Sequence, residues 1–141
     1  MAATTITFEL EQPPEAVFDY VADVRNEATW QKDILRVEKL GDAPVGEGTE
    51  FDAAYRLFGR MRLVLHEYRR PTHLVFDAEG PRMRMRFTMD VEPHAGGSRV
   101  AFAVDMRPRG VLLPLAPLLR LGLPREMAKR PDQFRAALAT A

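Results

Sequence analysis

Hydrophobic and polar residues alternate with a period of two through most of the stretch between Asp33 and Arg107. This period is typical of strands that bury one face of a sheet. Short turn segments with glycine or proline interrupt the alternation, and links this short join neighbouring strands in antiparallel order. The sequence therefore predicts six consecutive antiparallel strands, at about residues 33–40, 48–57, 60–68, 73–79, 82–92 and 98–107.

One further strand and two short helices are expected before this meander. Residues 5–10 alternate like a strand. Pro13 and Pro14 then suit the first turn of a helix, where a proline's missing N–H leaves no bond unmade. A second short helix is expected at residues 26–31 and carries Trp30. All of these elements belong to one predicted domain, residues 1–141.

The last thirty residues return to helical spacing. Apolar residues follow one another three, four or seven positions apart, at Leu112, Ala116, Leu119, Leu123, Met127, Phe134 and Leu138. This spacing predicts one long C-terminal helix that faces the sheet. Pro124 and Pro131 should kink or segment it, because an interior proline removes a hydrogen bond and costs about 3 kcal/mol.

The start of this helix is apolar on almost every side. Between Gly110 and Leu123 only Arg120 is charged. The segment therefore carries more apolar surface than one buried helix face requires. The apolar run is shorter than the roughly 20 residues that span a bilayer. We therefore expect part of it to line an opening or to make transient contact with a membrane. The alternative is that the region has no such role, and that the prolines kink the helix only so that it wraps around the sheet.

The predicted strand at residues 82–92 has an unusual inner face. Its inward positions are Met83, Met85, Phe87, Met89 and Val91. Methionine is unbranched and polarizable, so it adapts to irregular shapes better than the branched residues of a rigid core. This face indicates a wall that contacts a ligand, and the alternative is that the methionines only fill gaps in the core.

The strand at residues 60–68 has two candidate inner faces. Met61, Leu63 and Leu65 compete with a second set, Val64, His66 and Tyr68, and a slip of one residue exchanges the two. We favour the first set. The other inward positions include Phe51, Tyr55, Phe76 and Phe102.

Charge and cysteine content exclude several functions. Twenty basic and twenty acidic residues cancel, so no overall field attracts nucleic acid. The arginines of the predicted outer face are accompanied by carboxylates and lack interleaved aromatic residues, so no nucleic-acid partner is expected. The chain has no cysteine, which excludes disulfides and thiolate nucleophiles. The N-terminus lacks the basic and apolar regions of a secretory signal, so a cytoplasmic location is expected.

No complete catalytic or cofactor motif is present. Ser98 follows the Gly96-Gly97 turn, without the strand-to-helix elbow of a nucleophilic serine. His66, His73 and His94 lack metal-ligand spacing, and no glycine-rich phosphate loop is found. We therefore expect no metal and no cofactor.

The order of elements and four segments together resemble a known superfamily. The segments are QPPEAVFDYVADVRNEATWQKD, PVGEGTEFD, HEYRRPTHLVF and AGGSRVAFAVDM. They resemble the START-like (SRPBCC) superfamily, most of all its polyketide cyclase/dehydrase and lipid-transport branch, over nearly the whole chain. The resemblance implies an α+β helix-grip fold, in which a curved antiparallel seven-stranded sheet wraps around a long C-terminal helix and encloses an apolar cavity.

Members of this superfamily carry or sense lipids, cyclise or dehydrate polyketide intermediates, or bind partner proteins. Our favoured hypothesis is a monomer or homodimer that binds or carries a small hydrophobic molecule, such as a lipid, a fatty acid or a polyketide-like compound. The expected ligand-binding residues are Trp30, Phe51, Tyr55, Leu65, Phe76, Met85, Phe87, Met89, Phe102, Leu119, Leu123 and Met127. The alternatives are a cyclase or dehydratase that positions its substrate, with Tyr55 or His66 as the proton-transferring group, and a protein-interaction module.

Overall fold

The structure is a computed structural model and describes residues 3–140. Its elements in chain order are β1 (Thr4–Leu10), α1 (Pro14–Ala22), α2 (Val24–Glu27), β2 (Ile34–Leu40), β3 (Glu50–Tyr55), β4 (Gly59–Arg69), β5 (His73–Glu79), β6 (Met83–His94), β7 (Gly97–Pro108), the 3₁₀ helix η1 (Gly110–Leu115), α3 (Ala116–Ala128) and α4 (Arg130–Ala139).

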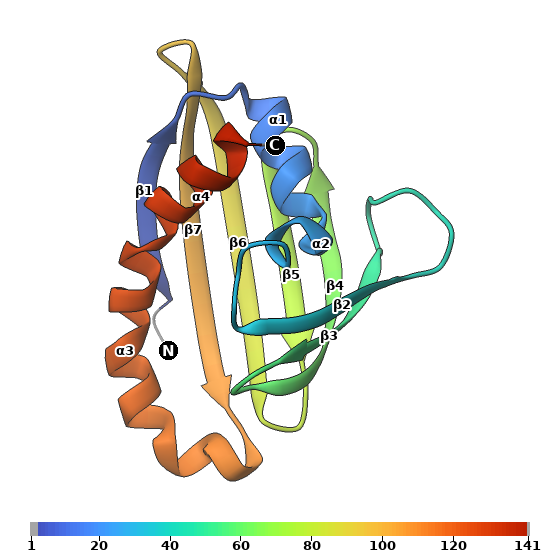
Figure 1. Cartoon of the computed structure of the whole chain (residues 1–141), viewed down its shortest axis with the longest axis vertical. Coiled ribbons are helices and arrows are strands. Elements are labelled where there is room, and N and C mark those ends of the chain that lie inside the picture. The colour runs from blue at the N-terminus through green and yellow to red at the C-terminus, as the bar shows by residue number, and fades with distance from the viewer. Residues whose placement is uncertain (1–2, 141) are drawn as a thin grey trace.

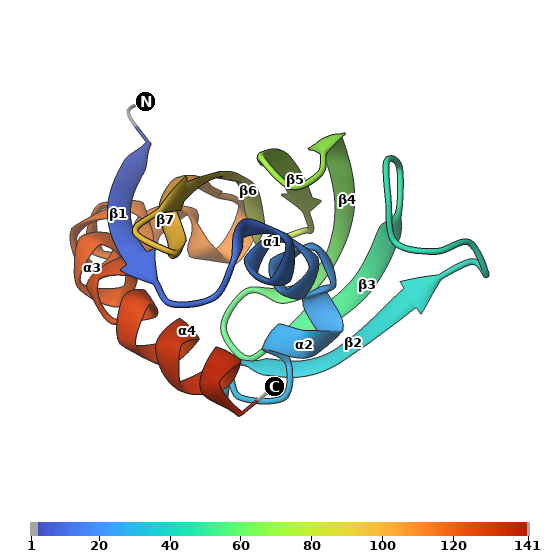
Figure 2. The same cartoon turned by 90° about the horizontal axis from the view of Figure 1, so that it is seen from above.

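The strands form one antiparallel sheet in the order β1-β7-β6-β5-β4-β3-β2. Each strand from β2 to β7 pairs with its neighbour in the chain, as the short links predict, and β1 adds to the outer edge of β7. Figure 2 shows the sheet as an arc, with α1 and α2 on its concave side and α3 and α4 along the open side between β1 and β2. The predicted α+β helix-grip fold is confirmed.

The register of β4 is the one that the sequence analysis favoured. Met61, Leu63 and Leu65 are buried on the concave side, and His66 lies on the outer face. The strand then bulges at Glu67, whose φ of 49° is left-handed, and the pairing with β5 shifts after His66. The bulge returns Tyr68 to the inner side, where its ring meets the edge of Phe18 at 5.2 Å between centroids.

The second helix differs from its predicted bounds. It covers Val24–Glu27 rather than residues 26–31, because the Asp23 carboxylate caps it by accepting a hydrogen bond from the backbone N–H of Arg25 at 3.1 Å. Trp30 consequently lies in the turn that follows the helix. Its indole N–H donates to the hydroxyl of Tyr20 at 3.1 Å.

The C-terminal helical region is segmented at one of the two expected prolines. Pro131 occupies the first turn of α4, so a new helix begins there after Lys129. Pro124 lies within α3 and does not end it. In Figure 1 the region begins with η1 at the lower end of the sheet, and α3 then runs up along its side.

The part of the concave face beneath α1 is solidly packed. α1 contributes Val17 and Phe18, which are almost fully buried against β6 and β7. The strands supply fully buried side chains below them, among which are Phe51, Leu65, Leu74, Met89 and Val100. The same concave face also lines a cavity, away from this packed region.

Candidate functional site

A cavity of about 450 Å³ lies between the sheet and α3. Its walls come from the concave face of the sheet, from α1, α2, α3 and α4, and from the segment that follows α2. The strands contribute Tyr55, Met61, Leu63, Phe76, Ala78, Met85, Phe87, Phe102, Val104 and Met106. The helices contribute Val21, Val24, Leu118, Leu119, Gly122, Leu123, Met127 and Phe134. An apolar lining of this kind excludes water from ligand contacts and favours apolar guests.

The sheet side of the cavity is an aromatic surface flanked by thioethers. Phe87 of β6 and Phe102 of β7 lie next to each other, with ring centroids 4.9 Å apart, and Phe76 of β5 lies 6.5 Å from Phe87. Met85 and Met106 occupy paired positions on β6 and β7. Alternation along each strand directs these side chains inward, where they present flat and adaptable surfaces.

Eight of the twelve residues predicted to bind a ligand line this cavity. They are Tyr55, Phe76, Met85, Phe87, Phe102, Leu119, Leu123 and Met127. Their inward direction agrees with the strand and helix periods of the sequence.

The other four residues do not reach the cavity. Phe51, Leu65 and Met89 point inward as expected but are fully buried in the packed region beneath α1. Trp30 lies behind the cavity wall, where it packs in a T-shaped arrangement with Phe134, with ring centroids 5.3 Å apart. An inward position on a strand thus does not by itself place a side chain against empty space.

His66 is not in the cavity. Its ring lies on the outer face of the sheet, with Nε2 3.3 Å from a carboxylate oxygen of Asp77. The interpretation of His66 as a proton-transferring group therefore does not agree with the geometry. Tyr55 does line the cavity.

Polar residues that the sequence analysis did not single out gather at one part of the cavity wall. They are Glu27 at the end of α2, Gln31 and Asp33 in the following segment, Glu126 of α3 and Arg130 of α4. Apolar periodicity cannot find such residues, because they come from segments far apart in the sequence and each reads as an ordinary surface position.

Arg130 is held in place by two glutamines. Its Nη1 donates to Oε1 of Gln133 at 2.9 Å. With the Gln31 amide oriented to satisfy its neighbours, the amide oxygen accepts from Nη2 of Arg130 at 2.7 Å. These hydrogen bonds fix the position of the Arg130 guanidinium, which places a positive charge in this part of the cavity wall.

The Glu27 carboxyl and the Tyr55 phenol, which both line the cavity, have raised pKa values. Burial raises the pKa of the Glu27 carboxyl, against the opposing effect of the Arg130 guanidinium. Burial also raises the pKa of the Tyr55 phenol, and the negative charge of Glu27 acts in the same direction. Both groups are thus shifted toward their neutral, proton-bearing forms. Among residues 3–140, no hydrogen bond to a protein group contributes to either shift.

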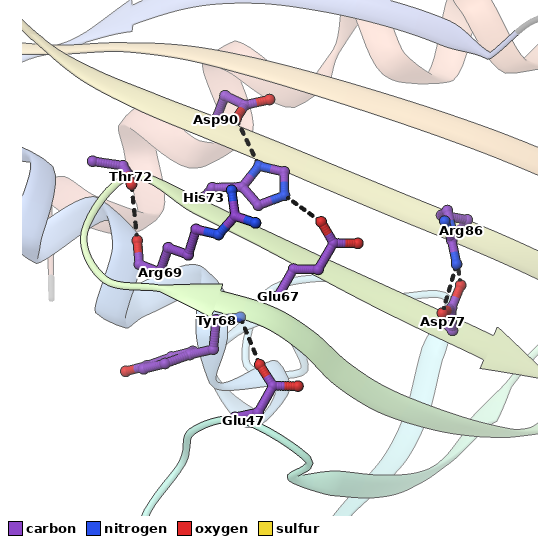
Figure 3. Close-up of polar contacts among 9 residues, drawn as sticks. All are labelled: Glu47, Glu67, Tyr68, Arg69, Thr72, His73, Asp77, Arg86 and Asp90. Carbon is purple, nitrogen blue, oxygen red and sulfur yellow. Dashed lines mark hydrogen bonds and ion pairs between the residues drawn. The ribbon is translucent and has the colours of Figure 1, made fainter.

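The outer face of the sheet carries matched charges, as the sequence predicted. Arg86 of β6 and Asp77 of β5 form a bidentate pair across the strands at 2.8 and 3.0 Å. His73 lies between two carboxylates, 2.7 Å from Asp90 and 3.1 Å from Glu67 (Figure 3). Pairing of opposite charges across adjacent strands stabilises the sheet.

Residues 3–140 contain neither a membrane-spanning helix nor a cluster of metal-ligating side chains. No helix in this range is long and apolar enough to cross a bilayer. The range also contains no group of three or more His, Asp or Glu side chains arranged to hold a metal ion.

The sheet, the helices and the cavity define the chain as a START-like protein of the helix-grip type. The family described as polyketide cyclase / dehydrase and lipid transport matches residues 1–139, and the chain belongs to this family. The resemblance found in the sequence is therefore confirmed. No curated protein matches the sequence.

Solved structures of low sequence identity share the fold. A conserved protein from Geobacillus kaustophilus superposes with a TM-score of 0.75 at 12% identity, covering 99% of this chain and 96% of that one. Protein MLL2253 from Mesorhizobium loti gives 0.71 at 11% identity, with 99% and 98% covered. Ara h 8.0201 gives 0.63 at 13% identity, with 96% and 93% covered. These similarities establish the fold.

Proposed function

We propose that this protein binds and carries a small hydrophobic molecule in the cavity between the sheet and α3. The observation that supports this proposal is an apolar space of about 450 Å³ in a protein with an otherwise densely packed core. Binding sites for small molecules occupy roughly 300–1,000 Å³ and combine apolar walls with a few polar groups. The polar group around Glu27 would orient one end of the ligand.

Direct binding measurements test this proposal. Purified protein would be analysed by native mass spectrometry for a bound molecule and titrated with the neutral dye Nile red. A fatty alcohol and a fatty acid of equal chain length would then compete with the dye. We expect saturable dye binding that the competitors displace. Protein that carries no bound molecule and binds none of these three probes would refute the carrier function.

A second candidate function is a cyclase or dehydratase that positions its substrate. Tyr55 favours it, because its pKa is raised by burial and its neutral phenol faces the apolar cavity, where it could donate a hydrogen bond to an oxygen atom of a substrate. Glu27 lines the same cavity. A hydrogen bond from such a donor stabilises negative charge on a carbonyl oxygen of the substrate. In this proposal Tyr55 would be the hydrogen-bond donor, and the aromatic wall would hold the substrate in a folded shape.

A matched pair of ligands tests whether the polar wall hydrogen-bonds an oxygen atom of a ligand. We expect wild-type protein to bind 2-naphthol more tightly than naphthalene, because only the naphthol can hydrogen-bond the polar wall. Tyr55→Phe should weaken 2-naphthol binding by up to about ten-fold and leave naphthalene binding unchanged. Tyr68→Phe is the matched control, since Tyr68 packs on Phe18 outside the cavity. Equal effects of Tyr55→Phe on both ligands would exclude the proposed hydrogen bond.

The cytoplasmic location, the absence of a nucleic-acid partner and the monomeric or dimeric state remain predictions.

A further inference from the structure

Exposed apolar side chains are concentrated on one segment of the described structure. Among residues 3–140, seven large apolar side chains are exposed, and five of them lie on η1 and the first turns of α3. We call these five the η1–α3 patch: Val111, Leu113, Leu115, Leu118 and Leu121. In Figure 1 the segment forms the lower end of the molecule, away from α1 and α2.

The exposure of the patch is large for leucine and valine. Leu121 is 75% exposed, Val111 72% and Leu118 67%. Leu118 and Leu121 are three residues apart on α3 and therefore lie on the same side of the helix. Single exposed leucines are ordinary, but a group of neighbouring ones indicates a surface that contacts something apolar.

The patch adjoins the cavity. Leu118 belongs both to the patch and to the cavity lining. Leu57, which follows β3, is 48% exposed and also lines the cavity. An apolar molecule that leaves the cavity beside these two residues would therefore meet the patch before it met open water.

The segment around the patch is strongly basic. Residues 107–130 contain six basic side chains, at Arg107, Arg109, Arg120, Arg125, Lys129 and Arg130, and a single acidic one, Glu126. The whole chain has a formal net charge of zero, so the positive charge is local.

Two of these arginines remain available to an outside partner. Arg107 pairs with Asp105, Arg109 with Glu79 and Lys129 with Glu126. Arg120 and Arg125 are exposed on α3 and have no carboxylate within 4 Å in the described part of the chain. Arg125 follows Leu121 by four residues, which places it on the same side of the helix.

We propose that the η1–α3 patch docks on the surface of an anionic lipid bilayer. The exposed leucines would enter the boundary between headgroups and acyl chains, and Arg125, on the same side of α3 as Leu121, would lie against the phosphates. A second copy of this chain fits the patch less well. A two-fold contact centred on the patch would bring the arginines of both copies together, and their like charges would repel.

Vesicle flotation tests the docking surface. Wild-type protein would be mixed with vesicles of phosphatidylcholine alone and with vesicles that also contain phosphatidylglycerol. We expect binding to the anionic vesicles that weakens as salt is added. Leu121→Glu should lower this binding by about ten-fold or more, because the new carboxylate would have to enter the interface. Arg125→Glu should lower it by a similar factor.

Matched variants on other surfaces serve as controls. Leu35→Glu changes a leucine that is 57% exposed on β2, and Arg84→Glu changes an exposed arginine on the outer face of β6. Both should bind anionic vesicles as wild type does. Leu121 does not line the cavity, so Leu121→Glu should also bind Nile red normally and melt at the wild-type temperature. Loss of vesicle binding with dye binding intact thus tests the docking surface separately from the carrier function.

Three outcomes would overturn the proposal. Wild-type protein could bind anionic vesicles no better than neutral ones. Leu121→Glu could bind vesicles as well as wild type does, or no worse than Leu35→Glu. Light scattering after size exclusion could show a dimer that Leu121→Glu dissociates, in which case a second copy occupies the patch.

Discussion

Two methionines on the same face of β6 have opposite surroundings. Met89 lies beneath α1 and is fully buried, whereas Met85, four residues earlier on the same face, lines the cavity beside α3. The strand is equally regular at both positions, so the helix that covers each region makes the difference. α1 packs directly on β6 and β7, and α3 lies along β1 and β7 and leaves space in front of the middle strands.

The direction of a side chain and its surroundings are therefore determined by different features of the fold. Alternation along a strand determines which side chains point inward. The distance of the covering helix determines whether those side chains meet protein atoms or empty space. Methionine suits both situations, because it packs in a dense core and also adapts to a guest.

The largest expected effect compares alanine at the two methionines. Met89→Ala should lower the free energy of unfolding by about 2–5 kcal/mol, because it opens a void in a packed region. Met85→Ala should cost less than half as much, since that side chain already borders a cavity. Urea denaturation of both variants measures the difference. Equal losses would mean that the cavity region is as tightly packed as the region beneath α1.

The second prediction concerns larger side chains in the two regions instead of smaller ones. Met85→Trp should reduce Nile red binding by about ten-fold and preserve stability, because the indole occupies space that is already empty. Leu74→Trp, in the fully buried region, should destabilise the protein by about 1–3 kcal/mol through overpacking. Dye titration and urea denaturation check the two results. Unchanged dye binding by folded Met85→Trp would place the dye outside the cavity.

The fold was accessible from the sequence because its signals are local. Alternation, turn residues and apolar spacing predicted the strands and their antiparallel order, and the apolar set on β4 was the correct inner face. Asp23 starts α2 earlier than predicted, since a capping carboxylate is a stronger start signal than the pattern used to place that helix.

The site was only partly accessible, for a physical reason. Phe51, Leu65 and Met89 read in the sequence like Phe87 and Met85, because inward direction does not depend on what lies opposite. The polar wall was missed because it exists only after folding. Glu27 and Arg130 come from opposite ends of the chain, and neither position carries a local signal of being beside an apolar cavity.

The smallest expected effect concerns His73 on the outer face of the sheet. His73 is paired with Asp90 and Glu67, and the hydrogen bond that the His73 ring donates to the Asp90 carboxylate is the main reason that the pKa of His73 is raised above its ordinary value of 6.5. A raised pKa means that the folded state holds the proton more tightly than the unfolded state does. The added stability is therefore fully present below about pH 6.5 and is lost as the pH rises through the pKa of the folded protein.

We expect this contribution to be below about 1 kcal/mol, because the Asp90 and Glu67 side chains are 62% and 47% exposed and solvent screens them. Urea midpoints measured at intervals from pH 5 to pH 9 would compare wild type with His73→Asn. The stability difference between the two should shrink as the pH rises, and Asp90→Asn should weaken the same pH dependence. Nile red binding should not follow it, since His73 and the cavity lie on opposite faces of the sheet. A matching pH dependence of dye binding would show that the two faces are coupled, and the separation between a structural outer face and a ligand-binding inner face would have to be abandoned.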